Sequence, residues 1–123
     1  MILVSLLTGF ALLQPAHAVV PPPDGGYPGG NTAEGQAALL ALTSGQFNTG
    51  IGFFSLLNNT TGNLNTALGA ATLALNTTAE QNTATGAGAL LSNTTGESNT
   101  ANGALHCCPT LPASTTLLSV PMR

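Results

Sequence analysis

The sequence predicts a repeat solenoid of 17-residue coils, a parallel β-roll, over residues 31–103. Three features recur with this spacing: an Asn-Thr pair opens each copy, Gly follows four positions later, and Leu follows the first four openings by eight. These residues are Asn31, Asn48, Asn65, Asn82 and Asn99; Gly35, Gly52, Gly69, Gly86 and Gly103; and Leu39, Leu56, Leu73 and Leu90. Such a fixed period is typical of a solenoid, in which each repeat packs mainly on its neighbours.

Residues 1–18 have the pattern of a secretory signal peptide. Ile2 to Leu13 form a mostly apolar run that is too short to span a bilayer, and Ala16-His17-Ala18 matches a signal-peptidase site. We therefore expect a secreted or outer-cell-surface protein, with His17 removed at cleavage. The alternative interpretation is a buried hydrophobic strand or helix.

Residues 19–30 are predicted to be a linker. Pro21-Pro22-Pro23 favours an extended polyproline conformation, and the glycine-rich residues that follow favour turns. Tyr27 fits a linker side chain best in this context, and the second interpretation is an aromatic cover for the first coil.

Each coil is expected to contain a short strand followed by a return segment. Asn-Thr-Ala-x-Gly suits the strand, and its Gly permits a positive φ or a close approach of the next coil. The return segment, such as Gly86 to Asn93, fits either a short helix or an extended segment. We favour the helix because Leu90 and Leu91 can then share one inward face, whereas a strand would leave a row of leucines outside. A trimer interface that buried this row would reverse the preference.

The Asn-Thr-Thr-Gly segments, such as Asn93 to Gly96, are turn sequences. Stacked coils would align Asn with Asn and Thr with Thr at a spacing of about 4.8 Å. Thr60, Thr77 and Thr94 share one phase and form a candidate binding ladder, as in ice-binding solenoids. The glycosylation pattern at Asn58, Asn59, Asn76 and Asn93 is interpreted as a by-product of the turn sequence.

Residues 104–123 form an aberrant tail, in which the repeat pattern is lost. Permitted codons for Leu105 to Leu118, read two bases later, encode A-L-L-S-N-T-T-G-K-H-N-T-A, which restores the repeat and places its next Asn 17 residues after Asn99. We hypothesise that the tail from about residue 105 is out of frame, and the alternative is a diverged capping coil. Cys107 and Cys108 beside His106 supply too few ligands for a zinc site.

Composition excludes several classes of function. Charged residues make up 4% of the chain, and Arg123 is the single basic residue, so no cationic surface for nucleic acid is expected. Glu80 and Glu97 lie one repeat apart, but their neighbours supply no nucleophile or oxyanion donor, so we interpret them as solvated turn residues. We expect no enzyme activity, no cofactor and no metal site. The low charge favours self-association or packing on additional repeats.

The repeat resembles those of large bacterial surface proteins and phage tail-fibre-like proteins. The segment Asn65-Thr66-Ala67-Leu68-Gly69 is similar to the N-S-x-A-x-G motif in the heads of trimeric autotransporter adhesins (YadA-like). This resemblance covers residues 31–103 and implies a left-handed parallel β-roll that trimerises and binds host or matrix surfaces. The chain departs from the family in its longer period, in a fourth position that is often polar, and in carrying no stalk, anchor or chaperone tail, and this last difference fits a truncated reading frame.

The sequence therefore predicts a non-catalytic, secreted or cell-surface repeat protein with a structural or adhesive role, as a truncated fragment of a larger adhesin or fibre. A second interpretation is an ice- or surface-binding β-solenoid that uses a threonine ladder. A third is a truncated gene product without function.

Overall fold

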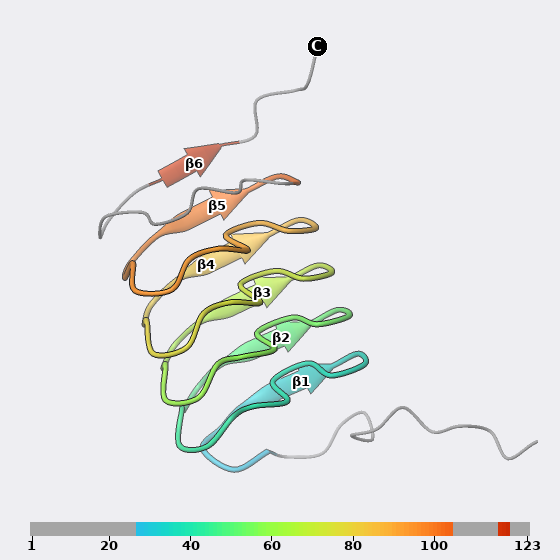
Figure 1. The fold of residues 1–123 in the computed structure, drawn as a ribbon, viewed down its shortest axis with the longest axis vertical. Helices are drawn as coiled ribbons and strands as arrows, with labels where there is room; N and C mark the ends of the chain where they lie inside the picture. Colours follow the sequence, from blue (N-terminus) through green and yellow to red (C-terminus); the bar gives the residue numbers. More distant parts are fainter. Residues whose placement is uncertain (1–26, 105–115, 119–123) are drawn as a thin grey trace, which may run out of the picture.

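The computed structural model describes residues 27–104 and the backbone of residues 116–118, and it shows a parallel β-solenoid (Figure 1). The predicted signal peptide, most of the linker and the tail residues 105–115 and 119–123 lie outside the described residues. The strands form one six-stranded sheet in chain order: β1 (Thr32–Glu34), β2 (Thr49–Ile51), β3 (Thr66–Leu68), β4 (Thr83–Thr85), β5 (Thr100–Asn102) and β6 (Thr116–Leu118). The predicted fold class is confirmed.

The coils stack in the register that the sequence predicts. We count positions 1–17 within each coil from its Asn, so that coils 1 to 4 begin at Asn31, Asn48, Asn65 and Asn82. Ala67 at position 3 lies between Gly50 and Ala84, and every pairing from β1 to β5 keeps this spacing. β6 extends the sheet, but Thr116 pairs with Thr100, one residue short of the repeat. Whether the tail is out of frame stays a prediction.

The core is thin because each strand contributes one small residue to it and each return segment contributes one leucine. Within each strand, position 3 points inward and is buried, as in Ala67 and Ala84, while position 2 points outward, as in Thr66 and Thr83. Opposite the strand lies the leucine of position 9: Leu56, Leu73 and Leu90 are all 0% exposed. Alanine, with its short side chain, lets the two walls approach until a single leucine per coil fills the space between them.

The return segment contains no helix within residues 27–104, so the preference for a helical return was wrong. Left-handed backbone recurs at positions 7 and 9, as at Ala71 (φ 56) and Leu73 (φ 52), and a right-handed helix cannot contain it. The N–H of Ala71 donates to Phe53 O in the preceding coil (2.7 Å), and the N–H of Leu73 donates to Ala89 O in the next (3.0 Å). The left-handed residues thus direct N–H groups to neighbouring coils, where their backbone bonds are made.

Consecutive leucines of the return segment accordingly point in different directions. Leu39 is buried, whereas Leu40, the next residue, is 68% exposed. Leu57 and Leu91 at the same position as Leu40 are half-buried. The outward row of leucines that the extended interpretation predicts is therefore present, interrupted in coil 3 by the buried Ala74.

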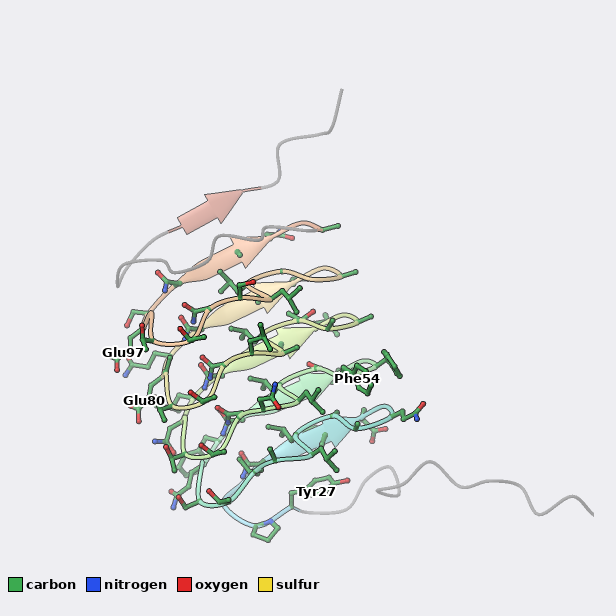
Figure 2. The ribbon with its side chains drawn as sticks, in the orientation of Figure 1. Tyr27, Phe54, Glu80 and Glu97 are labelled. Carbon is green, nitrogen blue, oxygen red and sulfur yellow. The ribbon has the colours of Figure 1, made fainter. Side chains whose placement is uncertain are left out.

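The N-terminal end of the stack is covered by residues 27–30. Tyr27 forms an isolated bridge with Asn31 and packs against the core, and Gly29 O accepts a hydrogen bond from the N–H of Phe47 (2.8 Å). Figure 2 shows the Tyr27 ring beneath the first coil. Of the two interpretations of Tyr27, the structure supports the aromatic cover. Tyr27 packs against the core cluster that contains Leu39 of the first coil, which has no preceding coil to cover it.

Candidate functional site

The asparagines at position 1 form a continuous buried ladder. The side-chain oxygens of Asn31, Asn48 and Asn65 each accept from both the N–H and the Nδ2 of the next Asn along the stack, whereas Asn82 Oδ1 accepts from the N–H of Asn99. Asn48 Oδ1, for example, accepts from Asn65 N at 3.0 Å and from Asn65 Nδ2 at 3.1 Å. The same Nδ2 also donates to Ala79 O within its own coil (2.9 Å). Asn48, Asn65 and Asn82 are 0% exposed. Both the acceptor and the donors of the amide are used, which is the condition for burying such a polar group.

Buried asparagines also recur at position 12 of coils 2 to 4, where one side-chain bond joins two of them, and Asn76 Oδ1 is buried without a hydrogen-bond partner. Asn76 Nδ2 donates to Asn59 Oδ1 in the preceding coil (2.9 Å) and to Ala79 O at the following turn (3.0 Å). Asn59, Asn76 and Asn93 are 0% exposed, so their amides are inaccessible to glycosylation in the folded chain. The half-buried Asn58 is the one member of the predicted pattern that is not fully buried.

The glycines at position 5 meet both conditions that the sequence suggests, a positive φ and a close approach of the next coil. Gly69 has φ +133, and a Cβ placed on it would lie 2.8 Å from Gly86 C in the next coil. Gly35, Gly52 and Gly86 have the same left-handed backbone and the same close approach to the glycine above them. Only glycine satisfies both conditions, so this column fixes the spacing of the coils.

The predicted binding ladder of Thr60, Thr77 and Thr94 lies in the turn and not on the sheet. Thr60 Oγ1 donates to Thr77 O in the next coil (3.1 Å), and Thr43 Oγ1 donates to Thr60 O in the same way (3.0 Å). These hydroxyls hold adjacent turns together. The donors of Thr43 and Thr60 are therefore engaged within the protein and are not free to bind an external surface.

A different threonine column, which the sequence analysis missed, lies on the outer face of the sheet. It occupies position 2 and comprises Thr32, Thr49, Thr66, Thr83 and Thr100. Four are exposed and Thr49 is half-buried. The side chains of Thr49, Thr66 and Thr83 make no hydrogen bond to the described part of the chain. The signal was available: a threonine beside a small alanine in a strand must face outward when the alanine faces the core.

The three carboxylates of residues 27–104, Glu34, Glu80 and Glu97, are exposed or half-buried and do not form a reactive cluster. Glu80 Oε1 accepts a hydrogen bond from Asn63 Nδ2 in the preceding coil (2.6 Å). Figure 2 shows Glu80 and Glu97 on the turns at one end of successive coils. Within residues 27–104, no three His, Cys, Asp or Glu side chains are grouped as a metal site would require. His106, Cys107 and Cys108 lie outside the described residues.

The fold thus presents a regular outer face and a set of internal ladders that maintain it. No protein-family model, curated protein or solved structure matches the chain. Across the described ranges, no helix has the length and apolar character needed to cross a membrane.

Proposed function

We propose that this chain is a non-catalytic structural or adhesive repeat protein of the secreted or cell-surface class, a fragment of a larger adhesin or fibre. The observation that carries the proposal is the additive way in which the coils are joined. Backbone bonds connect successive coils at the strand and at the return segment, as in Thr66 N to Asn82 O (2.8 Å) and Leu73 N to Ala89 O (3.0 Å). The asparagine ladder at position 1 adds side-chain bonds between successive coils, and the bond from Asn76 Nδ2 to Asn59 Oδ1 adds one more between coils 2 and 3.

A stack joined in this way forms a stiff rod whose length grows by about 4.8 Å with each coil. The buried asparagines, alanines and leucines that support stacking recur from coil to coil, whereas one outward position, position 4, varies; the outward position 2 is threonine in every copy. Position 4 holds Glu34, Ile51, Leu68, Thr85 and Asn102 in successive coils. A rod with a repeated interior and with outward side chains that differ between coils at position 4 suits a spacer or a presenting surface.

Secretion and adhesion are tested separately. Expression with residues 1–18 in place should yield extracellular protein that begins at Val19, as read by N-terminal sequencing. The recovered protein should then bind immobilised matrix proteins or host cells, and unfolding it should abolish binding. Absence of extracellular protein, with the chain retained and degraded, would favour a truncated gene product without function.

A second candidate is binding to an ordered surface such as ice, and the position 2 threonine column favours it. The column repeats at the strand spacing on one sheet face, and its exposed members present a methyl and a hydroxyl group to solvent. Thermal hysteresis that is lost in Thr66→Lys, and retained in the turn variant Thr77→Lys, would support this function. Equal effects of the two substitutions would contradict it.

A further inference from the structure

A hollow lies on the turns that lead from each return segment into the next strand. It extends over coils 1 to 3 and has a volume of about 490 Å³, within the range of roughly 300–1,000 Å³ for ligand pockets. Five polar residues line it: Ser44, Gln46, Thr61, Asn63 and Glu80. The apolar residues Phe47 and Leu64 complete the lining, and Figure 2 shows Glu80 on this side of the stack. We call this hollow the turn groove.

Phe47 is an exposed aromatic residue that the stacking of the coils does not require. Its side chain is 60% exposed, and its backbone is left-handed (φ 55), a conformation that bulky residues rarely adopt. Gln81 and Ser98 occupy the same position 17 in coils 3 and 4 with the same backbone, so a polar residue is sufficient there. A Cβ placed on Gly30 would lie 2.9 Å from Phe47 Cδ1, so the ring lies against the chain at Gly30 while most of it stays open to solvent. The turn groove therefore presents one accessible aromatic ring.

Hydrogen bonds between coils hold the position 16 side chains of the turn groove in one row. Gln46 N donates to Asn63 Oδ1 (2.8 Å), and Asn63 Nδ2 donates to Glu80 Oε1 (2.6 Å). The second carboxylate oxygen of Glu80 and the hydroxyls of Ser44 and Thr61 make no hydrogen bond to the described part of the chain. The groove thus offers unused donors and acceptors beside a row that is already ordered, which lowers the entropic cost of binding a ligand.

The composition of the turn groove favours an uncharged ligand. Among the residues that the structure describes, Glu80 is the one ionisable side chain that lines it, so the groove has no cation to bind a phosphate or a carboxylate. One carboxylate also makes a weak calcium site, because affinity for calcium rises with the number of charged ligands. A peptide strand would need an unpaired sheet edge, whereas the backbone here is bonded to neighbouring coils, as in Leu64 N to Gln46 O (2.9 Å). A neutral ligand with hydroxyl groups and an apolar face fits this lining best.

We propose that the turn groove binds a neutral oligosaccharide. A sugar ring has an apolar face of C–H groups, which packs on an aromatic ring such as that of Phe47. Its hydroxyl groups donate to carboxylate and amide oxygens and accept from amide and hydroxyl donors, which are the polar groups of the groove. Two coil spacings, about 10 Å, give room for a disaccharide. The proposal goes beyond the structural or adhesive function and does not rest on it.

The test is a titration of the isotope-labelled full chain with cellobiose, maltose, lactose and diacetylchitobiose, followed by heteronuclear NMR of the backbone amides. Sialyllactose, which carries a carboxylate, is the anionic comparison. Phe47→Ser removes the ring and introduces the residue that coil 4 has at this position. The matched control is Phe53→Ala, which removes an exposed phenylalanine outside the groove and introduces the residue of coils 3 and 4. Glu80→Gln removes the charge but keeps an oxygen that can accept from Asn63.

At least one neutral disaccharide should shift the amide signals of residues 44–47, 61–64 and 80, with a Kd of about 1 mM, because the groove is open and offers one aromatic ring. Phe47→Ser should raise this Kd roughly tenfold or more, whereas Phe53→Ala should change it less than about twofold. Glu80→Gln should raise it severalfold, since a neutral amide accepts more weakly than a carboxylate.

The amide spectrum of each variant shows whether it is folded, and Glu80→Gln carries the test if Phe47→Ser unfolds. No shift with any of the neutral sugars at about ten times the expected Kd would overturn the proposal. Equal losses in the two phenylalanine variants, or tighter binding of sialyllactose than of lactose, would also overturn it. Failure of the chain to be secreted or to adhere to matrix proteins would not affect it.

Discussion

Replacing Asn65 by Ala tests whether the buried asparagine ladder holds the coils together. The Asn65 side chain takes part in four hydrogen bonds: its Nδ2 donates to Asn48 Oδ1 (3.1 Å) and Ala79 O (2.9 Å), and its Oδ1 accepts from Asn82 N (3.1 Å) and Asn82 Nδ2 (3.2 Å). Asn65 is 0% exposed. Alanine removes all four bonds at the centre of the stack, far from either end.

The expected loss of stability follows from the polar groups that the substitution leaves without hydrogen-bond partners. Ala79 O keeps its bond from Asn76 Nδ2 (3.0 Å), and Asn48 Oδ1 keeps its bond from the N–H of residue 65 (3.0 Å). Asn82 loses the acceptor for both its N–H and its Nδ2. A buried donor without a partner costs about 1–3 kcal/mol, so two of them should lower the free energy of unfolding by about 3–4 kcal/mol. That is a large share of the stability of a small domain.

Urea unfolding followed by far-UV circular dichroism measures this loss. With an m-value of about 1 kcal/mol per M, the midpoint should fall by about 3 M, or the variant should be unfolded without urea. The matched control is Thr66→Ala, the next residue, which is exposed and should change stability by less than about 0.5 kcal/mol. If the two variants lose equal stability, the ladder does not stabilise the fold in this way.

Three further substitutions test the backbone and the core. Gly69→Ala should cost more than about 3 kcal/mol, because the new Cβ meets the next coil's backbone at 2.8 Å and φ is +133. Ala71→Gly should raise the melting temperature by relieving φ 56, whereas Ala70→Gly, outside the left-handed positions, should lower it; equal signs would contradict this. Leu73→Ala should lower the free energy of unfolding in urea by about 2–5 kcal/mol, and the substitution Leu75→Ala at an exposed position should lower it much less. Equal losses in the two variants would show that Leu73 contributes little to the core.

Much of the inner structure was predictable because stacking repeats one environment in every coil. A residue type that recurs every 17 positions contacts its own copy in the coils above and below, so a buried position must hold a residue type that can pack on or bond to itself. Asparagine can donate to and accept from another asparagine, and glycine alone permits the close contact at Gly69. The asparagine, glycine and leucine columns of the sequence are therefore the columns of the structure.

The return segment was not predictable from its residues. Ala71 and Leu73 favour right-handed backbone when considered alone, yet both are left-handed in the fold. Their conformation is set by hydrogen bonds to Phe53 O and Ala89 O, which belong to other coils. A local preference of about 1–2 kcal/mol per residue yields to backbone groups that would otherwise be buried without partners.

Some features of the outer face were also determined by the sequence, and others only by the tertiary structure. The sequence alone determined the period, the parallel stacking and the threonines that recur at position 2. Only the fold showed that Phe47, Leu64, Ile51 and Leu68 are exposed, since their burial depends on which way the coil turns each side chain. The reason is physical: an internal column is fixed by contact with its own copies, whereas an external patch depends on which unlike residues the coil places side by side.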